Sequence, residues 1–425
     1  MALPQIDEQR LWVNIMETSK YGAHKSIHGG MSRLSLSDGD RLVRNWFVEK
    51  AKSLGCEVKV DEMGNIFATW YGLGSKFDAS PIGMGSHLDT QPIGGRFDGV
   101  LGVIGALEVI ETLQASGVQL GRPLTAINWT NEEGARFPAM CSGSSVWADN
   151  KVLDKFHNLQ SFTEPGKTMR SELATIQYLG DTKCCHVTNK LAAHFELHIE
   201  QATVLEKTGK QIGVVTGIQG MRWFRIKIVG AEGHAGSSPM STRVDAMVAA
   251  AKIILHVDET ARRVNGFGTV GCLKPASIAT NTIVGSVELI SDFRHASDKT
   301  LDEVEAGLQT LLRELEIETP GLTTEMKVSW LNTAIDFHED AIECVEQAAK
   351  SVCGESHLKM ISRAAHDSAE TAKVSPTAMI FVPSRNGISH NPEEYTTPKQ
   401  CLKGVQVLLE SVVAYDRLLT SREGN

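Results

Sequence analysis

The sequence predicts an α/β protein with a smaller α+β domain inserted into it, and three patterns indicate this arrangement. Strand-like and helix-like runs alternate through the first half of the chain, as in a sheet covered on both faces. Strands in the middle of the chain alternate apolar and polar residues, which is typical of a sheet with one wet face. Helix–strand alternation returns near the end, so the segments flanking the insertion are expected to form one domain.

Four segments of the first half carry the α/β pattern. Residues 65–71 (NIFATWY) are rich in aromatic and β-branched residues and predict a strand. Residues 81–86 form a short apolar run, and residues 124–129 (LTAINW) predict another buried strand. Between them, apolar residues at 100, 103, 104, 107 and 110 have helical spacing, with Asp98-Gly99 where that helix would begin.

The middle of the chain predicts strand, helix, two strands, helix and strand. The expected elements are a strand at 221–229, a helix at about 243–265, strands at 268–273 and 282–293, a helix at about 298–315 and a strand at 323–331. The later elements are a strand at 377–382 and a final helix from about 397. We therefore predict one domain built from 1–212 and 332–425, and an inserted domain at 213–331.

Length, charge and hydropathy predict the number of domains and argue against nucleic-acid and membrane partners. At about 150 residues per domain, 425 residues predict two or three domains. Lys and Arg number 42 against 51 Asp and Glu, a formal charge of −9, which argues against a nucleic-acid partner. No stretch reaches the roughly 18 apolar residues that a membrane span needs, so no membrane partner is expected.

The cysteines and the first residues predict a cytoplasmic location. Eight cysteines are scattered along the chain without a CxxC pair, which favours free thiols in a reducing compartment. The opening MALPQIDEQRLW has neither the basic-then-apolar pattern nor the Arg-rich pattern of a targeting leader.

Histidines and carboxylates follow the predicted strands in four groups. The groups are Ser86-His87-Leu88-Asp89 with Gly94–Gly99, Asn131–Gly134, Glu196–Gln201 and Gly387–Asn391. In an open α/β sheet, ligands bind at the carboxyl ends of the strands. Three histidines and several carboxylates there suit two divalent ions, most readily Zn, with Mn, Co or Ni as alternatives. One carboxylate would bridge the ions, and an Asp two residues from a ligand His would orient its ring.

The adjacent pair Glu132-Glu133 is the most informative of these groups. Two acids at the end of an apolar strand are costly to bury unless a cation meets them. Their side chains point in different directions along extended chain, so one can bind metal while the other moves a proton. A metal pair with a free Glu beside it is suited to hydrolysis. The metals lower the pKa of bound water, and the Glu accepts the proton and later gives it to the leaving group.

Each group by itself also has a structural interpretation. A lone His at a strand end is more often a hydrogen-bonded residue of the core or surface, and a Glu-Glu pair is usually a solvated face. Having all four groups in one chain favours the metal site. The remaining histidines without such context are interpreted as structural: His24, His28, His157, His186, His194, His256, His338 and His357.

The run HLDTQPIGGRFDGVLGV resembles the signature of the dinuclear-zinc amidase and peptidase family. The motifs NEEGARF, ELHIEQ, GHAGSSPMSTRVDA, ISDFRH and GISHNPEEY resemble its amidohydrolase branch, which contains N-carbamoyl-L-amino-acid hydrolases, β-ureidopropionases and allantoate amidohydrolases. These matches run in order from about residue 80 to 400. The resemblance implies a mixed-sheet catalytic domain holding two metals, with the inserted domain as a lid and dimerisation domain.

The resemblance also implies roles for individual residues. One metal would be held by His87, Asp98 and His198, and the other by Asp98, Glu133 and His390, with Asp98 bridging. Glu132 would be the general base and acid, and Asp89 would orient His87. His234 would stabilise the oxyanion in the partner subunit of a homodimer. Arg294 would bind the substrate carboxylate, helped by Asn281 and Gln201, and His366 and Asp367 would support the site.

Some loops depart from the branch pattern without touching a predicted ligand. HIEQ is followed by Ala202-Thr203 in place of Gly-Pro, and Arg363 and Ala365 replace glycines before His366. The motif Asn-Val-Ile-Pro-Gly becomes Asn281–Gly285, with Thr282 and Val284 changed. Replacing Gly adds bulk and restricts the backbone, so the substrate is less determined than the reaction.

The sequence thus predicts a metal-dependent amidohydrolase for small molecules that carry a carboxylate and a ureido or amide group. N-carbamoyl-β-alanine and N-carbamoyl-L-α-amino acids are the expected substrates, giving the amino acid, carbon dioxide and ammonia. The alternatives are an allantoate amidohydrolase, a related metallopeptidase or N-acyl amidase, and a homologue that binds a carboxylate without turnover.

Overall fold

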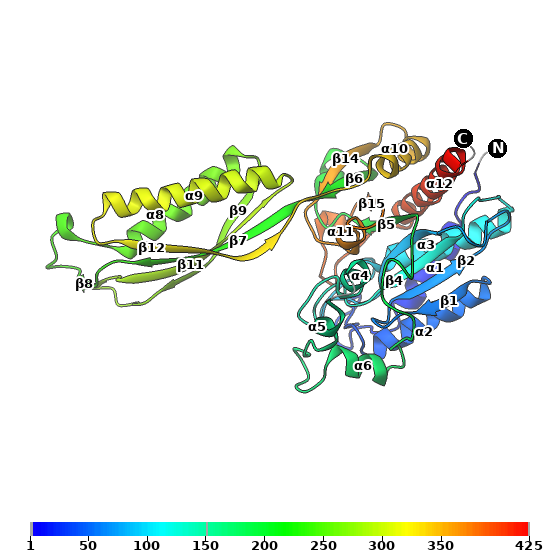
Figure 1. Cartoon of the computed structure of the whole chain (residues 1–425), viewed down its shortest axis with the longest axis horizontal. Coiled ribbons are helices and arrows are strands. Elements are labelled where there is room, and N and C mark those ends of the chain that lie inside the picture. The colour runs from blue at the N-terminus through cyan, green and yellow to red at the C-terminus, as the bar shows by residue number, and fades with distance from the viewer. Residues whose placement is uncertain (1–2, 150–151, 424–425) are drawn as a thin grey trace. The chain divides into compact units, whose positions relative to one another are not determined.

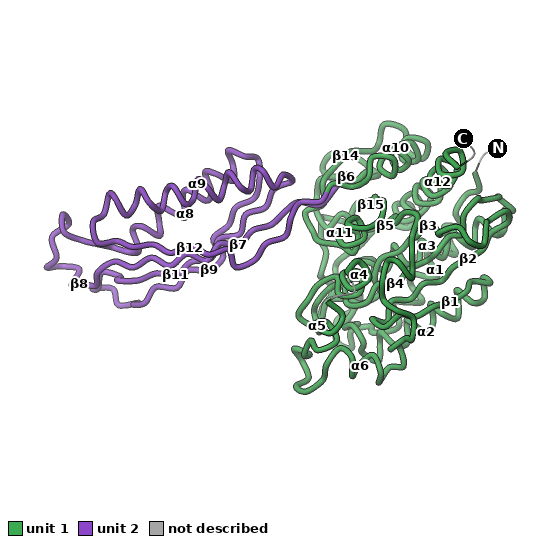
Figure 2. Tube along the Cα trace, viewed as in Figure 1, with its two compact units in different colours: residues 1–216, 336–425 green, residues 217–335 purple. Residues whose placement is uncertain are grey.

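The computed structural model of the chain describes residues 3–149 and 152–423. The chain divides into two compact units, coloured separately in Figure 2. Unit 1 combines residues 1–216 with residues 336–425, and unit 2 is the continuous segment Gly217–Ile335. The insertion expected at 213–331 and the observed unit 2 differ by a few residues at each end.

Unit 1 is built on a nine-stranded mixed sheet in the order β1-β2-β4-β3-β5-β15-β6-β13, with β14 paired to β6. The strands are β1 (Glu57–Val60), β2 (Ile66–Trp70), β3 (Ile82–His87), β4 (Leu124–Trp129), β5 (Ala193–Ile199), β6 (Ile212–Ile218), β13 (Ile335–Asp336), β14 (His357–Ser362) and β15 (Thr377–Val382). The central strands β4, β3, β5 and β15 are mutually parallel where they pair. Every residue of these four is buried, so both sheet faces are covered, as predicted.

The helices of unit 1 flank this sheet. They are α1 (Glu8–Thr18), α2 (Asp38–Ser53), α3 (Val100–Ser116), α4 (Ser142–Ala148), α5 (Leu153–His157), α6 (Met169–Thr175), α7 (Val204–Thr208), α10 (Glu339–Cys353), α11 (Asp367–Thr371) and α12 (Pro398–Glu423), with a 3-10 turn η3 (Arg385–Gly387). Helix α3 is apolar almost throughout because it packs against β3, β4 and β5 on one side and against α1 and α12 on the other.

Unit 2 is a four-stranded antiparallel sheet with two long helices on one face, and Figure 1 shows this layer arrangement. The sheet order is β12-β7-β11-β9, with β7 (Gly220–Val229), β9 (Phe267–Pro275), β11 (Ser286–His295) and β12 (Thr323–Asn332). The helices are α8 (Ala246–Arg263) and α9 (Asp298–Glu318), and η2 (Met240–Thr242) is a short 3-10 turn. On β7, Phe224, Ile226 and Ile228 are buried beneath the helices, while the alternate residues are exposed, as the apolar–polar pattern predicted.

The prediction of one strand at 282–293 is wrong in one respect, because the structure divides this segment into two strands. Residues Thr282–Ile283 form β10, which pairs with β8 (Gly233–His234) in a separate two-stranded sheet, and β11 begins at Ser286. The division falls where the Val284 carbonyl accepts the N–H of Ala246 and the Gly285 carbonyl accepts that of Gly230. These local hydrogen bonds replace ladder bonds, and the apolar pattern alone does not reveal them.

The structure also describes the cysteines and the apolar character of the helices. All eight cysteines are free of disulfide bonds, and most are buried. Within residues 3–149 and 152–423, the structure contains no helix that is both long and apolar enough to cross a membrane.

The close approach of α3 to β5 predicts a stability difference between two glycines of the same helix. A Cβ at Gly102 would lie 2.4 Å from the carbonyl oxygen of Leu197, whereas one at Gly105 would lie 3.0 Å from a methyl group of Val405. We expect Gly102→Ala to lower the free energy of unfolding by about 1–3 kcal/mol through overpacking. Gly105→Ala is the matched control and should be close to wild type, since a side chain can yield where a backbone oxygen cannot. Denaturant titration of both variants measures this, and equal stabilities would contradict the packing account.

Candidate metal centre

The histidines and carboxylates singled out in the sequence gather at one edge of the unit 1 sheet. His87 is the last residue of β3, and Glu132 and Glu133 follow closely after β4. His198 lies at the end of β5, and His390 lies in the loop that follows β15. Because these four strands are parallel, their carboxyl ends meet at the same edge, which is where open α/β sheets bind ligands.

Asp98 lies at the centre of this cluster and divides its two oxygens between two groups of side chains. Asp98 Oδ1 is 3.5 Å from His87 Nε2 and 3.1 Å from His198 Nε2. Asp98 Oδ2 is 3.4 Å from His390 Nε2, and that nitrogen is 3.3 Å from Glu133 Oε2. The ligand atoms of each group lie within 4.8 Å of one another, so each group could hold one ion and Asp98 would be common to both.

The two histidines of the first group are oriented for metal binding by backbone carbonyls. His87 Nδ1 lies 2.9 Å from the carbonyl oxygen of Asp89, and His198 Nδ1 lies 2.9 Å from that of Ile199. A carbonyl only accepts, so Nδ1 donates in both rings and Nε2 is the atom that faces Asp98. His198 Nε2 also lies 3.1 Å from the backbone N–H of Gly99, from which it can accept a hydrogen bond when the ring is neutral. Among the described atoms, the buried His87 Nε2 has no hydrogen-bond partner. The residues therefore fit a divalent cation.

The electrostatics of the cluster favour positive charge. Burial works to lower the pKa of His87, yet the charges of Glu132 and Asp98 raise it well above the usual value. Burial raises the pKa of Glu132 well above its usual value, and it does the same for Glu133, beside Asp98. Buried carboxylates at this density are costly unless cations pair with them. Two divalent ions would supply that charge.

Glu132 belongs to neither of these two ligand groups. Its Oε2 is 3.5 Å from His87 Nε2, so it borders the first group without belonging to it. Its Oε1 lies 3.7 Å from Cys141 Sγ, which is within range of a weak thiol hydrogen bond. After burial, the nearby Asp367 is a further cause of its raised pKa. A carboxyl group in this position remains available for proton transfer.

Asp89 is placed differently from the sequence expectation. The expectation was that its side chain would orient His87, but the carbonyl oxygen of Asp89 does so, and the carboxylate Oδ1 lies farther away, 3.9 Å from Nδ1. The Asp89 carboxylate instead accepts the backbone N–H groups of Glu132 and Glu133, each at 3.3 Å. It therefore fixes the backbone that carries the two glutamates.

Gln201, a predicted substrate ligand, contacts Asp98. Its Nε2 donates to Asp98 Oδ2 at 2.8 Å and to Ser389 Oγ at 3.0 Å. Its Oε1 is buried without a partner among the described residues. Gln201 therefore supports the central carboxylate, and any role toward a substrate stays a prediction.

His366 and Asp367 lie beside the cluster. The His366 ring is 4.5 Å from that of His198, centroid to centroid, and its Nε2 is 3.1 Å from Ser362 Oγ. Burial, together with the charge of His198, lowers the pKa of His366 to about 3, so the ring is neutral. Asp367 accepts a hydrogen bond from Ser144 Oγ at 2.5 Å, and burial raises its pKa well above the usual value.

Glu196 could complete a further ligand group with His198 and His366. Its two oxygens are already engaged: Ser86 Oγ donates to Oε1 at 2.7 Å, and the N–H and Oγ of Ser368 donate to Oε2 at 3.0 and 2.6 Å. These bonds link β5 to β3 and to α11, and they already use both oxygens of Glu196.

Two residues not singled out from the sequence bind Glu133 and the backbone at Asp98. Gln91 donates to Glu133 Oε2 at 2.7 Å. Glu394 accepts the backbone N–H groups of Phe97 and Asp98 at 2.9 and 3.1 Å. Burial raises the pKa of Glu394 to about 7. Both residues lie inside motifs already quoted, so a carboxylate or amide within a ligand-bearing motif was the available signal.

His234 and Asn281 belong to unit 2 and lie beside each other there. The chain at His234 pairs with Thr282, and the carbonyl of Asn281 accepts the N–H of Ala235 at 2.8 Å. His234 Nδ1 accepts the backbone N–H of Gly236 at 3.0 Å. A neutral His234 therefore carries its hydrogen on Nε2, and the exposed ring offers that N–H as a donor.

Arg294 is on β11 of unit 2, two residues from its ion-pair partner Asp292. Its Nη2 and Nε donate to Asp292 Oδ2 at 2.8 and 3.1 Å, which orients the guanidinium. The Arg294 side chain is 38% exposed, so part of its planar edge stays accessible to a second carboxylate.

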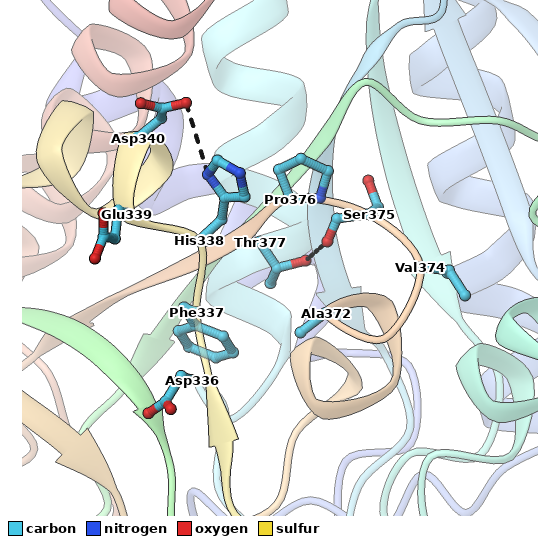
Figure 3. A pocket seen from close by; sticks show the side chains of 10 residues that line it. All are labelled: Asp336, Phe337, His338, Glu339, Asp340, Ala372, Val374, Ser375, Pro376 and Thr377. Carbon is cyan, nitrogen blue, oxygen red and sulfur yellow. Dashed lines mark hydrogen bonds and ion pairs between the residues drawn. The ribbon is translucent and has the colours of Figure 1, made fainter.

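A groove elsewhere in unit 1 does not coincide with the cluster. It has a volume of about 600 Å³ and is lined by residues 336–340, 372 and 374–377 (Figure 3). His338 lies 3.9 Å from Asp340 there, and Thr377 Oγ1 donates to the carbonyl of Ser375. None of the predicted site residues lines this groove. Converging ligands, rather than the size of a hollow, identify the functional site.

The chain is similar to known proteins along most of its length. The sequence profile described as peptidase family M20/M25/M40 matches residues 83–414. The chain is 36% identical over 415 residues to an N-carbamoyl-L-amino-acid amidohydrolase of Rhizobium meliloti, covering 96% of each protein. It is 34% identical over 400 residues to a ureidoglycolate hydrolase of Oryza sativa subsp. japonica, covering 89% of this chain and 79% of that protein.

A solved structure matches both units. It is an amidase of the hydantoinase/carbamoylase family from Burkholderia multivorans, with a TM-score of 0.88 and 39% identity over 96% of this chain and 98% of that one. The resemblance inferred from the motifs is thereby confirmed. The chain belongs to peptidase family M20/M25/M40.

Proposed function

We propose that this chain hydrolyses the carbamoyl C–N bond of N-carbamoyl amino acids, yielding the amino acid, carbon dioxide and ammonia. The observation that carries the proposal is a pair of ligand groups sharing Asp98, with Glu132 beside them and outside both. Similarity to an N-carbamoyl-L-amino-acid amidohydrolase along nearly the whole chain supports it. N-carbamoyl-L-α-amino acids and N-carbamoyl-β-alanine are the proposed substrates.

His87, Asp98 and His198 would hold one divalent ion, and Asp98, Glu133 and His390 the other. We propose Zn for both, with Mn, Co or Ni as alternatives, since imidazole and carboxylate ligands suit all of them. When bound, such ions polarise a carbonyl and lower the pKa of water.

Glu132 would move the proton that hydrolysis requires. It accepts the proton of the attacking water as the O–C bond forms at the carbamoyl carbon. It then delivers that proton to the leaving nitrogen as the C–N bond breaks. Burial raises its pKa, which makes the protonated form accessible for the second step.

Residues of unit 2 would bind and orient the substrate. The Nε2–H of His234 is a suitable donor to the oxyanion, and in the proposed homodimer it would act on the partner subunit's substrate. Arg294 would pair with the substrate carboxylate, with Asn281 assisting and Gln201 acting from unit 1. A cytoplasmic location is part of the same proposal.

Ureidoglycolate is a second candidate substrate, because the chain is also similar to a ureidoglycolate hydrolase. Like allantoate, it carries a ureido group and a carboxylate, so the same cluster and the same Arg294 would serve. One methylene or hydroxyl in a pocket changes discrimination by about 1–3 kcal/mol, which a direct assay resolves.

Ammonia release from the purified protein tests the reaction and the substrate together. The protein is supplied in turn with Zn, Mn, Co or Ni and offered N-carbamoyl-L-amino acids, N-carbamoyl-β-alanine, ureidoglycolate and allantoate. We expect chelator-sensitive turnover of an N-carbamoyl amino acid. If only ureidoglycolate or allantoate were turned over, that compound would replace N-carbamoyl amino acids as the proposed substrate. If the metal-bound protein released no ammonia from any of these compounds, the proposed reaction would be overturned.

Glu132→Gln tests the proposed proton carrier. The amide keeps the size of the side chain but cannot accept the proton, so kcat should fall by about 10²–10⁴-fold. Metal content, measured by elemental analysis, should stay at the wild-type level. Glu49→Gln, an exposed position on α2, is the control and should retain full activity. An E132Q variant with wild-type kcat would remove Glu132 from the mechanism.

Arg294→Lys tests the carboxylate contact. Lysine keeps the charge but loses the planar two-nitrogen fork, so KM should rise by about 10–100-fold, equivalent to a charged hydrogen bond of about 1.5–3 kcal/mol. Arg225→Lys changes another exposed arginine of unit 2, paired with Glu288, and should leave KM unchanged. Equal KM values for R294K and wild type would show that Arg294 does not bind the substrate.

A further inference from the structure

Glu394 is a buried carboxylate that directly contacts the segment carrying Asp98. The residue is 4% exposed. Oε1 accepts the N–H of Phe97 at 2.9 Å and the N–H of Asp98 at 3.1 Å. The backbone of the central metal ligand is thus held by a residue nearly 300 positions later in the chain.

Ser389 adds a connection through side chains. Its hydroxyl donates to Asp98 Oδ2 at 2.6 Å, the oxygen that faces His390. The same Oγ lies 3.3 Å from Glu394 Oε2. Ser389 and Glu394 therefore hold both the side chain and the backbone of Asp98; together we term them the Asp98 clasp.

The segment that precedes Asp98 packs closely against the Glu394 carboxylate. A Cβ at Gly95 would lie 2.3 Å from Glu394 Cδ and from its Oε1, closer than any side chain can approach. Only glycine at position 95 leaves room for the Glu394 carboxylate to reach the N–H groups of Phe97 and Asp98.

His390 needs such support more than the other histidine ligands. Its side chain is 47% exposed, whereas those of His87 and His198 are 1% exposed. Its backbone has φ of 53°, a left-handed conformation that is uncommon outside glycine. The clasp residues flank His390 in sequence, so their bonds to Asp98 also fix the loop that presents this ring.

We infer that the Asp98 clasp, Ser389 and Glu394, positions Asp98 against His390 and thereby sets the affinity of the second metal site, formed by Asp98, Glu133 and His390. Both are positioning residues, because they act through the ligands. The first site should depend on the clasp less, since its histidines are held by the carbonyls of Asp89 and Ile199. This inference rests on the metal pair of the proposed function.

The test measures zinc binding to the full-length apoprotein by competition with a chromophoric chelator, and needs no substrate. Wild type should bind two zinc ions. Glu394→Ala should weaken one of the two sites by about 10–100-fold, the usual cost of losing a group that orients a ligand. Ser389→Ala should weaken the same site to a smaller extent. Glu393→Ala, the exposed neighbour, should bind both ions as wild type does.

Glu394→Gln separates positioning from a general structural role. The amide oxygen can still accept both N–H groups, and its NH₂ can donate to Ser389 while Ser389 continues to donate to Asp98. E394Q should therefore recover most of the lost affinity. Thermal unfolding of the apoproteins shows whether each variant is folded.

The inference would be overturned if folded E394A and S389A bound both zinc ions with wild-type affinity. Equal weakening of both sites would also overturn it, as would an E394Q variant that binds zinc as poorly as E394A. Wild type binding fewer than two zinc ions would instead count against the metal pair on which the proposed function depends. The failure of one is thereby distinguished from the failure of the other.

Discussion

The arrangement of the candidate metal centre depends on Asp98, because its two carboxylate oxygens face two different groups of side chains. One buried carboxylate faces two histidines with one oxygen and a third histidine with the other, among further carboxylates whose pKa values burial raises. Such an arrangement is costly as a set of protein charges alone. It becomes favourable when divalent cations lie between the ligands. Backbone carbonyls at Nδ1 keep the Nε2 atoms of His87 and His198 facing Asp98.

The fold meets this requirement through parallel strands that end at one edge. Strands β3, β4, β5 and β15 deliver ligand-bearing loops to the same place although they are far apart in sequence. Hydrogen bonds from backbone atoms then fix the side chains. Carbonyl groups orient the imidazoles of His87 and His198, and the backbone N–H groups of the two glutamates donate to the Asp89 carboxylate. The inserted unit 2 leaves this cluster intact, because unit 1 is assembled from the segments on either side of it.

Much of this was predictable from residue patterns. Apolar runs and helical spacing located the central strands and α3, and alternation located β7, because burial on one or two faces leaves a periodic trace. Motifs singled out the proposed ligands His87, Asp98, Glu133, His198 and His390, which the structure brings together in one cluster. Hydrogen bonds to backbone atoms were not predictable, since they depend on where loops meet. Asp89 therefore contacts the backbone of the glutamates rather than chiefly the imidazole, and Glu394 was overlooked.

Anomalous diffraction from crystals grown with zinc tests the central claim most directly. Data collected on both sides of the zinc edge give the number and positions of the ions without reference to activity. The account predicts two anomalous peaks, one beside His87 and His198 and the other beside Glu133 and His390, with one oxygen of Asp98 facing each. A single peak, or two peaks that Asp98 does not bridge, would contradict it.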